Sequence, residues 1–140
     1  MKKTALKRGT VQLKKTKLGK VSKTPIGKLK KKLWLVFSLY IRTRDKNICF
    51  ICNKSATGSA YHAGHFIPKS VGGADLYFHE DNVHGCCYHC NINLGGNLYE
   101  YGIKLGKDKC DELYLIKNKS FSKWTEEIYL NKIKHYSNLK

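Results

Sequence analysis

Two cysteine pairs with the same two-residue spacer are the strongest chemical signal in this sequence. They are Cys49 with Cys52, and Cys87 with Cys90. Each short loop turns two thiolates toward one point, and two such loops complete a tetrahedron. Four thiolates suit a structural Zn²⁺, because no coordination position then stays open for a substrate. We therefore expect these four cysteines to hold one zinc ion.

A neighbouring cysteine competes for a place in the second pair. Cys86 and Cys90 have three residues between them, a spacing that a helix can also present to a metal. We prefer Cys87, because its spacer to Cys90 matches that of the first pair. Cys86 and Cys110 are then expected to be small core residues.

Histidine and asparagine side chains lie between and just after the cysteine pairs. His62 and His65 follow the first pair, Asn82 precedes the second, and Asn91 directly follows Cys90. A histidine, then an asparagine, then a second histidine or asparagine beyond a cysteine pair is the spacing of an HNH nuclease motif. A zinc knot that holds these segments in register lets a small domain fold without a large core.

The surrounding pattern predicts an α+β fold: a zinc-stapled HNH (ββα-metal) finger between an N-terminal packing helix and C-terminal helices. A strand is expected over 61–68 and short extended pieces near Leu76, Phe78 and Val83. Helices are expected over 108–116 and after Thr125, which can cap the last one. Apolar residues at helical spacing predict the packing helix, and the last helix has a shorter apolar face. The first set is Leu29, Leu33, Val36, Phe37, Tyr40 and Ile41; the second is Ile128, Leu130, Ile133 and Tyr136.

Basic residues are concentrated at the N-terminus of this 140-residue chain. The formal net charge is +17, and fifteen of the 27 Lys and Arg residues precede Asp45, the first acidic residue. We expect a disordered basic arm over 1–28, the packing helix over 29–45, a zinc-bound nuclease core over 46–101 and a C-terminal helical segment over 102–140. Such an arm favours nucleic acid over an anionic membrane surface as the partner. Phosphate contacts, which set affinity and salt dependence, are expected from Lys28, Lys30, Lys31, Lys32, Arg42, Arg44 and Lys69.

Apolar runs in the sequence are short. The longest, 33–41, is too short to span a bilayer, and no apolar segment follows the first lysines as in a signal peptide. We therefore expect no membrane partner, a cytoplasmic location and reduced cysteines.

Several segments resemble the NinG (Rap) recombination nuclease family of phage lambda. They are VFSLYIRTRD at 36–45, AGHF at 63–66, LYFHEDNVH at 76–84, CYHCN at 87–91, GNL at 96–98 and WTEE at 124–127. The likeness covers roughly residues 29 to 140, and phage endonuclease VII is similar in a looser way. The resemblance implies an endonuclease that cuts branched recombination intermediates, Holliday junctions or D-loops, in the cytoplasm of a bacterial host. It also implies phage or host recombination proteins as partners.

On this resemblance we assign roles to the candidate site. His65 is the general base that takes a proton from the attacking water, since the ordinary pKa of imidazole lies near working pH. Asn82 orients His65 or its loop. His62 and Asn91 hold one catalytic divalent ion, Mg²⁺ or Mn²⁺, which stabilises the charge on the phosphate and the leaving oxygen. The expected products carry 5′-phosphate and 3′-hydroxyl ends.

The sequence departs from the family pattern at the metal ligands. His62 stands where the family usually has aspartate, and Gly64 stands where HNH motifs in general have an acidic ligand. A ring nitrogen brings no charge, which favours manganese or nickel over magnesium. The N-terminal arm also lacks the extra cysteines of other family members.

Alternatives stay open for two accessory residues, for the oligomeric state and for the function. His84 orients a metal ligand or hydrogen-bonds inside the finger; Asn97 contacts metal or phosphate, or forms a turn after Gly95 and Gly96. The last helix offers a face for a homodimer, which junction cleavage often uses. The rival function is a non-catalytic zinc-ribbon protein that binds DNA or RNA and does not need His65, Asn82 and Asn91 together.

Overall fold

The first described element, α1 (Pro25–Arg44), begins four residues earlier than the sequence predicts. Proline is favoured in the first turn of a helix, because its fixed φ suits the helix and its missing N–H would have no partner there. The computed structural model describes residues 25–119 and 122–139. The expected boundary of the basic arm at residue 28 is therefore wrong, and residues 1–24 of that arm lie outside the described residues.

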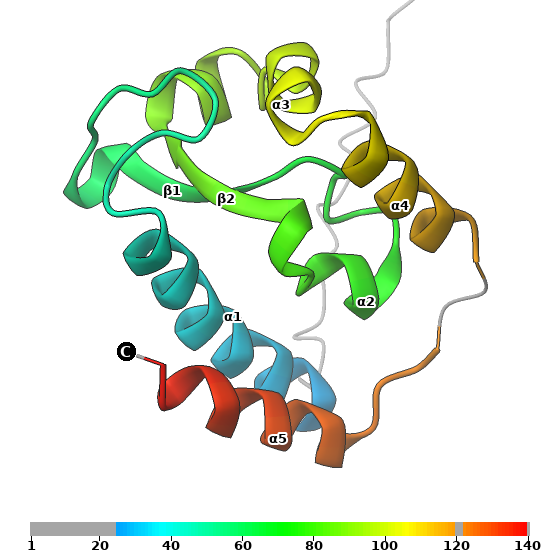
Figure 1. Cartoon of the computed structure of the whole chain (residues 1–140). Coiled ribbons are helices and arrows are strands. Elements are labelled where there is room, and N and C mark those ends of the chain that lie inside the picture. The colour runs from blue at the N-terminus through cyan, green and yellow to red at the C-terminus, as the bar shows by residue number, and fades with distance from the viewer. Residues whose placement is uncertain (1–24, 120–121, 140) are drawn as a thin grey trace, which may run out of the picture.

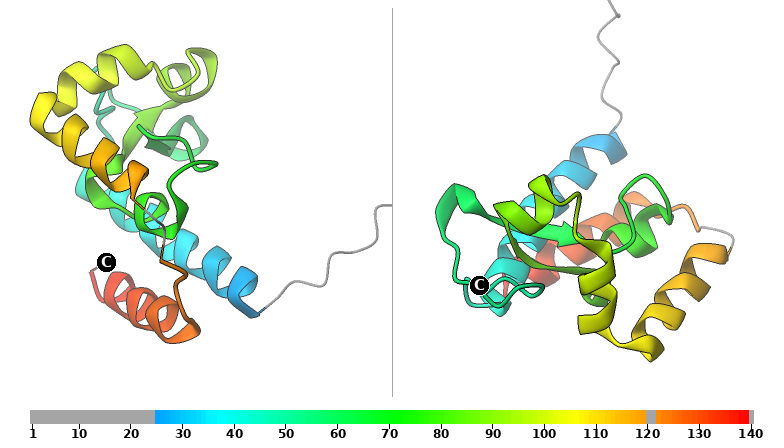
Figure 2. Two further views of the ribbon diagram at one scale, coloured as in Figure 1. Left: turned by 90° about the vertical axis from the view of Figure 1, so that its right-hand side faces the viewer. Right: turned by 90° about the horizontal axis from the view of Figure 1, so that it is seen from above.

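Helix α1 packs against the last helix, α5 (Glu126–Ser137), and the two lie side by side (Figures 1 and 2). The buried stripe of α1 is Leu33, Phe37 and Ile41, as its spacing predicts. Phe37 meets Tyr136 of α5 edge to face, with ring centroids 4.9 Å apart. These two helices form one layer of the molecule.

Thr125 caps α5 as predicted, its side chain accepting a hydrogen bond from the Ile128 backbone N–H at 3.4 Å. The buried face of α5 differs from the prediction. Tyr129 is buried beside Ile133 and Tyr136, whereas Ile128 and Leu130 are exposed. At about 100° per residue, the positions three and four residues apart share the face that meets α1.

Two short antiparallel strands, β1 (Tyr61–His65) and β2 (Val83–Cys87), form the sheet. Their register pairs Tyr61 with Cys87 and His65 with Val83. Gly85 is required here, because a Cβ at this position would lie 1.7 Å from the Tyr61 hydroxyl oxygen, which donates to the Ile48 carbonyl. The strand predicted over 61–68 is therefore present, although it ends at His65.

The connection between the strands is helical. It contains α2 (Gly73–Tyr77) and the 3-10 turn η2 (Glu80–Asn82). The predicted extended pieces at Leu76 and Phe78 are wrong: Gly72, at φ +101°, turns the chain into α2, which buries Leu76.

The cysteine-rich half lies on the other side of the sheet from α1 and α5 (Figures 1 and 2). It holds η1 (Gly58–Ala60), η3 (His89–Asn93), α3 (Leu98–Leu105) and α4 (Lys107–Asn118), the last where the sequence predicts a helix. One apolar cluster packs around the cysteines and Tyr101, and a second fills the space between α1, α5 and the sheet.

Arg44 and Asp45 join α1 to the sheet. The Arg44 guanidinium donates to the carbonyl oxygens of Glu80 and Val83 and pairs with Asp45. Asp45 in turn accepts the Gly85 backbone N–H at 2.6 Å. This corrects the expectation that Arg44 contacts DNA phosphate: its donors are used within the fold.

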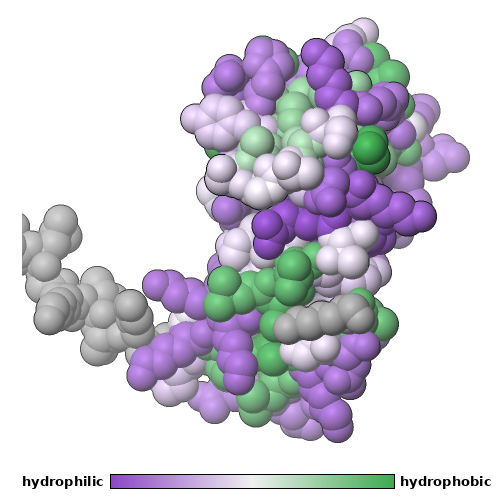
Figure 3. Space-filling model, turned by 90° about the vertical axis from the view of Figure 1, so that its left-hand side faces the viewer, coloured by the Kyte–Doolittle hydropathy of each residue, from purple (hydrophilic) through white to green (hydrophobic). Residues whose placement is uncertain are grey.

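The surface over α1 and α5 contains both hydrophobic and hydrophilic side chains. On the face in Figure 3, hydrophobic and hydrophilic side chains lie beside one another over the lower half of the molecule, where these helices lie. Within the described residues, no helix is both long and apolar enough to cross a membrane.

Candidate metal centre and active site

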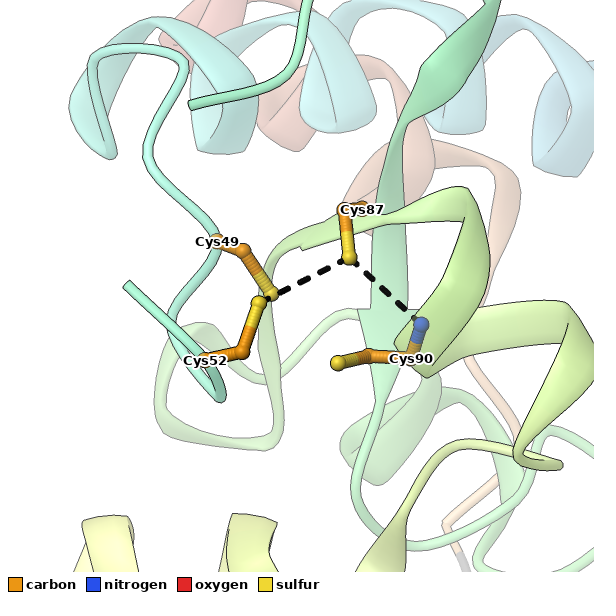
Figure 4. A group of neighbouring side chains, drawn as sticks. All are labelled: Cys49, Cys52, Cys87 and Cys90. Atoms are coloured by element: carbon orange, nitrogen blue, oxygen red, sulfur yellow. Dashed lines mark hydrogen bonds between the residues drawn. The ribbon is translucent and has the colours of Figure 1, made fainter. Parts of the chain in front are cut away.

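The four predicted cysteines meet at one point (Figure 4). The sulfur atoms of Cys49, Cys52, Cys87 and Cys90 all lie within 4.8 Å of one another. Cys52 and Cys87 are separated by 3.8 Å between sulfurs. A tetrahedral Zn²⁺ with bonds of about 2.3 Å requires sulfur–sulfur distances of about 3.8 Å. The cluster therefore fits a structural metal such as zinc.

Local backbone geometry brings each pair into place. Asn53 adopts a left-handed φ of 59° and donates its backbone N–H to the Cys49 carbonyl, which closes the first loop. The second pair joins the end of β2 to η3, and the Cys90 backbone N–H approaches the Cys87 sulfur at 3.5 Å. The two loops face each other from segments far apart in the sequence.

The two remaining cysteines lie outside the cluster, as predicted. Cys86 is buried, and its thiol donates to the His84 carbonyl at 3.4 Å. Cys110 donates to the Gly102 carbonyl at 3.5 Å and packs against the core. The choice of Cys87 over Cys86 as a member of the cluster is confirmed.

His65 ends β1, and aromatic rings surround it. Its ring stacks on Trp34 of α1, with centroids 5.2 Å apart, and meets Tyr77 of α2 edge to face. Nε2 donates to the Tyr77 carbonyl oxygen at 2.9 Å. Nδ1 is buried and has no hydrogen-bond partner among the described residues. The carbonyl therefore fixes the hydrogen on Nε2 and leaves the lone pair on Nδ1.

The environment keeps His65 neutral. Burial lowers its pKa to about 4, against the opposing effect of the Tyr77 carbonyl, and nearby Lys69 lowers it further. A neutral imidazole with a free lone pair has the protonation state that a general base requires.

His62 and Asn91 form a pair near β1. Asn91, on η3, donates its Nδ2–H to His62 Nδ1 at 3.0 Å. His62 Nε2 donates to the Ser59 carbonyl at 3.0 Å. Side chains alternate along a strand, so His62 lies on the opposite face from His65. The structure thus brings His62 and Asn91 together, while His65 faces α1.

Gly64 is fixed by its neighbours. A Cβ at this position would lie 2.9 Å from both the Asn91 side-chain oxygen and the Cys86 sulfur. Those two side chains occupy the space that an acidic ligand at position 64 would need. Gly64 therefore departs from the general HNH pattern at a position where other side chains already fill the space for an acidic group.

Asn82 holds the loop that follows His65. Its side-chain oxygen accepts the Ile67 backbone N–H at 2.7 Å, and Nδ2 donates to the carbonyls of Ile67 and Leu76. The residue is fully buried. Asn82 therefore acts on the loop that ends at Tyr77, and among the described residues its side-chain hydrogen bonds go to Ile67 and Leu76 and not to the His65 ring.

His84 and Tyr101 form an internal chain of hydrogen bonds. His84 Nδ1 lies 3.0 Å from the Tyr101 hydroxyl, which donates to the Gly64 carbonyl at 3.1 Å. His84 also stacks on Phe50, and burial lowers its pKa to about 4. Asn97 occupies the left-handed turn at the start of α3, with φ 44°. His84 thus makes the internal hydrogen bond that is one of its two predicted roles, and Asn97 lies at the turn predicted after Gly95 and Gly96.

Two adjoining surface depressions contain the candidate site. One, of about 400 Å³, includes His65, Lys69, Ser70 and Asn91 in its lining. The other, of about 360 Å³, includes Trp34, Arg42, His62, Lys69 and Asn91. Lys69 and Asn91 line both depressions, so the two adjoin.

The charge of the side chains that line these depressions limits which catalytic metal ion could bind there as a second metal. Of the residues that the structure describes, no carboxylate lines either one, and Lys69 and Arg42 contribute positive charge. Mg²⁺ binds through carboxylate and phosphate oxygens, so the protein donors present do not fit it. An imidazole and an amide suit Mn²⁺ or a later transition ion better.

The remaining predicted phosphate contacts lie near the site. Lys28, Lys31 and Lys32 are exposed on α1. Lys30 lies over the Tyr77 ring, its Nζ 4.3 Å from the centroid, and Lys69 lies over Trp34 at 5.2 Å. These lysines leave α1 and the loop after β1 strongly positive around the depressions.

Sequence reasoning missed the aromatic surroundings of His65. Trp34 adjoins the predicted buried stripe of α1, and Tyr77 lies in a stretch predicted to be extended. Their contact with His65 depends on how α1 and α2 meet the sheet. The run of three lysines that precedes Leu33 and Trp34 was the signal in the sequence that could have pointed to Trp34.

Comparison with known proteins gives a consistent result. The sequence model of a family described as "Bacteriophage Lambda NinG protein" matches residues 1–140. "Protein ninG" of Escherichia phage 933W is 30% identical over 131 residues, which is 90% of this chain and 64% of the relative. "Protein ninG" of Escherichia phage lambda is 29% identical over 117 residues, 81% of this chain and 56% of the relative. The chain therefore spans less than two thirds of these relatives, and no solved structure matches it.

Proposed function

Since the chain belongs to the NinG family, we propose that it is an HNH-type endonuclease that hydrolyses phosphodiester bonds in branched DNA. The observation that carries this proposal is the state of His65: neutral, fixed by the Tyr77 carbonyl through Nε2, and with an unpartnered Nδ1. A structural histidine in a small domain normally satisfies both nitrogens. An unused buried lone pair beside a basic depression favours catalysis.

The proposed reaction needs one base and one attacking water. His65 Nδ1 takes a proton from the water, and the oxygen of that water bonds to phosphorus. The bond from phosphorus to the 3′ oxygen breaks, and this oxygen takes a proton from solvent. The products then carry a 5′-phosphate and a 3′-hydroxyl. Nδ1 is covered in the DNA-free chain, so the step requires a neighbouring side chain to move when DNA binds.

Positive side chains would hold the phosphate during this reaction. Lys69 lines both depressions. Arg42 donates from Nε to the Ser38 carbonyl, and its terminal nitrogens have no hydrogen-bond partner among residues 25–119 and 122–139. Fixed cations beside the phosphate stabilise the charge that develops in the transition state. A transition-metal ion, if one binds, would be held by His62 Nδ1 and the Asn91 side-chain oxygen, would displace the hydrogen bond that Asn91 donates to His62, and would add to this charge stabilisation.

The preference for branched DNA rests on family resemblance. The positive charge alone fits any nucleic acid, since phosphate contacts carry no information on sequence or branching. Phage or host recombination proteins are proposed partners on the same ground, as is a bacterial cytoplasmic location. Pairing of two copies would place two sites on opposite strands of a junction.

Cleavage assays test the proposal. The full chain, loaded with zinc, is incubated with labelled four-way junction, D-loop, flap and linear duplex DNA in buffer with Mg²⁺, with Mn²⁺ or with no added divalent ion. We expect nicking of the branched forms, supported better by Mn²⁺ than by Mg²⁺. His65→Ala removes the base and should lower the rate at least 100-fold. His135→Ala, an exposed histidine on α5, is the matched control.

The rival function is a zinc-containing nucleic-acid-binding protein without catalysis. Tight binding by a folded, zinc-loaded chain, with no cleavage under any metal condition, would favour it. Cleavage that survives in folded His65→Ala would contradict the proposed base.

A further inference from the structure

A cluster of aromatic and basic side chains lies on α1 beside the candidate site. Trp34 stacks on His65 and meets Tyr77 at a right angle, with centroids 5.3 Å apart. Lys30 lies over Tyr77, and Lys69 lies over Trp34. Residues of this cluster thus reach from the surface of α1 to the His65 ring.

A mostly apolar depression of about 540 Å³ lies on the outer side of this cluster. Its lining consists of Gly27, Lys30, Lys31, Trp34, Leu35 and Tyr77. Leu35 is 69% exposed on this strongly basic helix. Trp34 also lines the depression that contains His62 and Asn91. We call the outer depression the Trp34 groove; it adjoins the candidate site through that one ring.

The charge around the groove selects a polyanion. Residues 25–44 contain no acidic side chain, and Lys28, Lys30, Lys31 and Lys32 lie in the first half of α1. An apolar, aromatic floor bordered by lysines fits an unpaired nucleotide: the base packs on the rings and the lysines meet the backbone. In a duplex the bases are stacked on one another and cannot reach such a floor.

The two tryptophans of the chain differ in a way that supports this assignment. Trp124 donates its indole N–H to Asp75 at 2.6 Å and stacks on Phe78. The indole N–H of Trp34, by contrast, has no hydrogen-bond acceptor in the part of the chain that the structure describes. Trp124 is therefore tied into the fold, while Trp34 keeps a donor available for a ligand.

We propose that the Trp34 groove binds an unpaired segment of single-stranded DNA next to the phosphate that is cut. This inference rests on the proposed function and makes it more specific: the substrate needs unpaired nucleotides beside the scissile bond. Trp34 and Tyr77 contact the bases, and Lys30 and Lys31 contact the phosphates. Because Trp34 also stacks on His65, the same ring links occupancy of the groove to the position of the base.

A binding experiment without cleavage tests the groove. The full chain carrying Trp124→Phe, which leaves Trp34 as the single tryptophan, is titrated with a twelve-nucleotide oligothymidylate and with a duplex of twelve base pairs, without added divalent ion and with excitation selective for tryptophan over tyrosine. We expect the single strand to quench Trp34 fluorescence. Stacking of about 1–3 kcal/mol per base corresponds to roughly 5- to 150-fold in affinity. In the otherwise natural chain, Trp34→Ala should therefore weaken binding of the single strand at least fivefold and binding of the duplex less than twofold.

Matched variants separate a binding role from a packing role. Trp34→Phe keeps an aromatic ring and should retain most of the affinity for the single strand, even where Trp34→Ala unfolds. Lys31→Ala should weaken single-strand binding more than Lys134→Ala, which removes an exposed lysine on α5. Absence of quenching, or equal losses for single strand and duplex in folded Trp34→Ala, would overturn the inference.

Failure of the groove and failure of the nuclease proposal are distinguishable. If the single strand binds at Trp34 while the wild-type chain cuts no DNA, the groove stands and the nuclease assignment fails. If the chain cuts branched DNA in a His65-dependent way while Trp34 does not discriminate single strand from duplex, the nuclease stands and the groove inference fails.

Discussion

The two ring nitrogens of His65 have different surroundings. The Tyr77 carbonyl holds the hydrogen on Nε2, and burial disfavours the charged ring. Its Nδ1 is buried and has no hydrogen-bond partner among the described residues.

The pH dependence of cleavage should reveal this environment. An unperturbed histidine would lose its base function as the pH falls through about 6.5. Burial lowers the pKa of His65 to about 4, so the ring stays unprotonated well below neutrality. We expect no loss of the single-turnover rate attributable to His65 between pH 8 and pH 5.5. An inflection near pH 6.5 that His84→Gln leaves unchanged would contradict a buried, neutral base.

Gly64 should not tolerate a side chain. A Cβ would lie 2.9 Å from both the Cys86 sulfur and the Asn91 oxygen, and overpacking of this kind costs about 1–3 kcal/mol. Gly64→Ala should therefore lower the free energy of unfolding in urea by that amount. Adding Cys86→Ala removes one of the two collisions. The double variant should then lose less stability than the sum of the two single losses; strict additivity would argue against a direct contact.

At the level of elements, the loop between the strands is the part that sets the position of His65. Asn82 ties both ends of this loop together through Ile67 and Leu76, and Tyr77 follows directly. The asparagine thus connects β2 to the loop whose carbonyl fixes the ring.

Removal of the Asn82 amide should loosen that loop. Asn82→Ala leaves the Ile67 N–H and two carbonyls without their buried partners, which costs about 2–4 kcal/mol. We expect a drop of this size in the free energy of unfolding and a lower cleavage rate in the fraction that stays folded. Asn93→Ala, at an exposed position on η3, is the control and should change neither. Equal stability of the two variants would contradict the role of Asn82.

At the level of the whole molecule, two hydrophobic clusters form the core. One lies between α1 and α5, and the other surrounds the four cysteines. The sheet between them has two short strands, too little for independent stability. A metal in the cysteine cluster would connect the loop after α1 to the end of β2.

Metal removal tests this dependence. Binding of zinc to four thiolates contributes directly to folding in small domains. We expect one zinc ion per purified chain by metal analysis, and a lower melting temperature with less helical circular dichroism after chelation. Cys49→Ser should lose the zinc, whereas Cys110→Ser, outside the cluster, should keep it. Full thermal stability after complete loss of zinc would contradict a structural role.

Features that depend on spacing along the chain could be predicted from the amino-acid sequence. The two cysteine pairs, the apolar stripe of α1, the Thr125 cap and the placement of α4 follow from local geometry, because each involves residues within a few turns of one another. The choice of Cys87 over Cys86 is of the same kind. These patterns, with the family resemblance, were enough to pick out His65, Asn82 and Asn91.

Tertiary structure alone decided how those residues are used. Arg44, which we expected to contact phosphate, links α1 to the sheet. The carbonyls of Glu80 and Val83, which accept its hydrogen bonds, come close to it only in the folded chain. Trp34 and Tyr77 reach His65 only because α1 and α2 converge on the end of β1. The space at Gly64 is likewise filled from two other segments. Contacts between distant segments depend on packing angles and register, which no local pattern specifies.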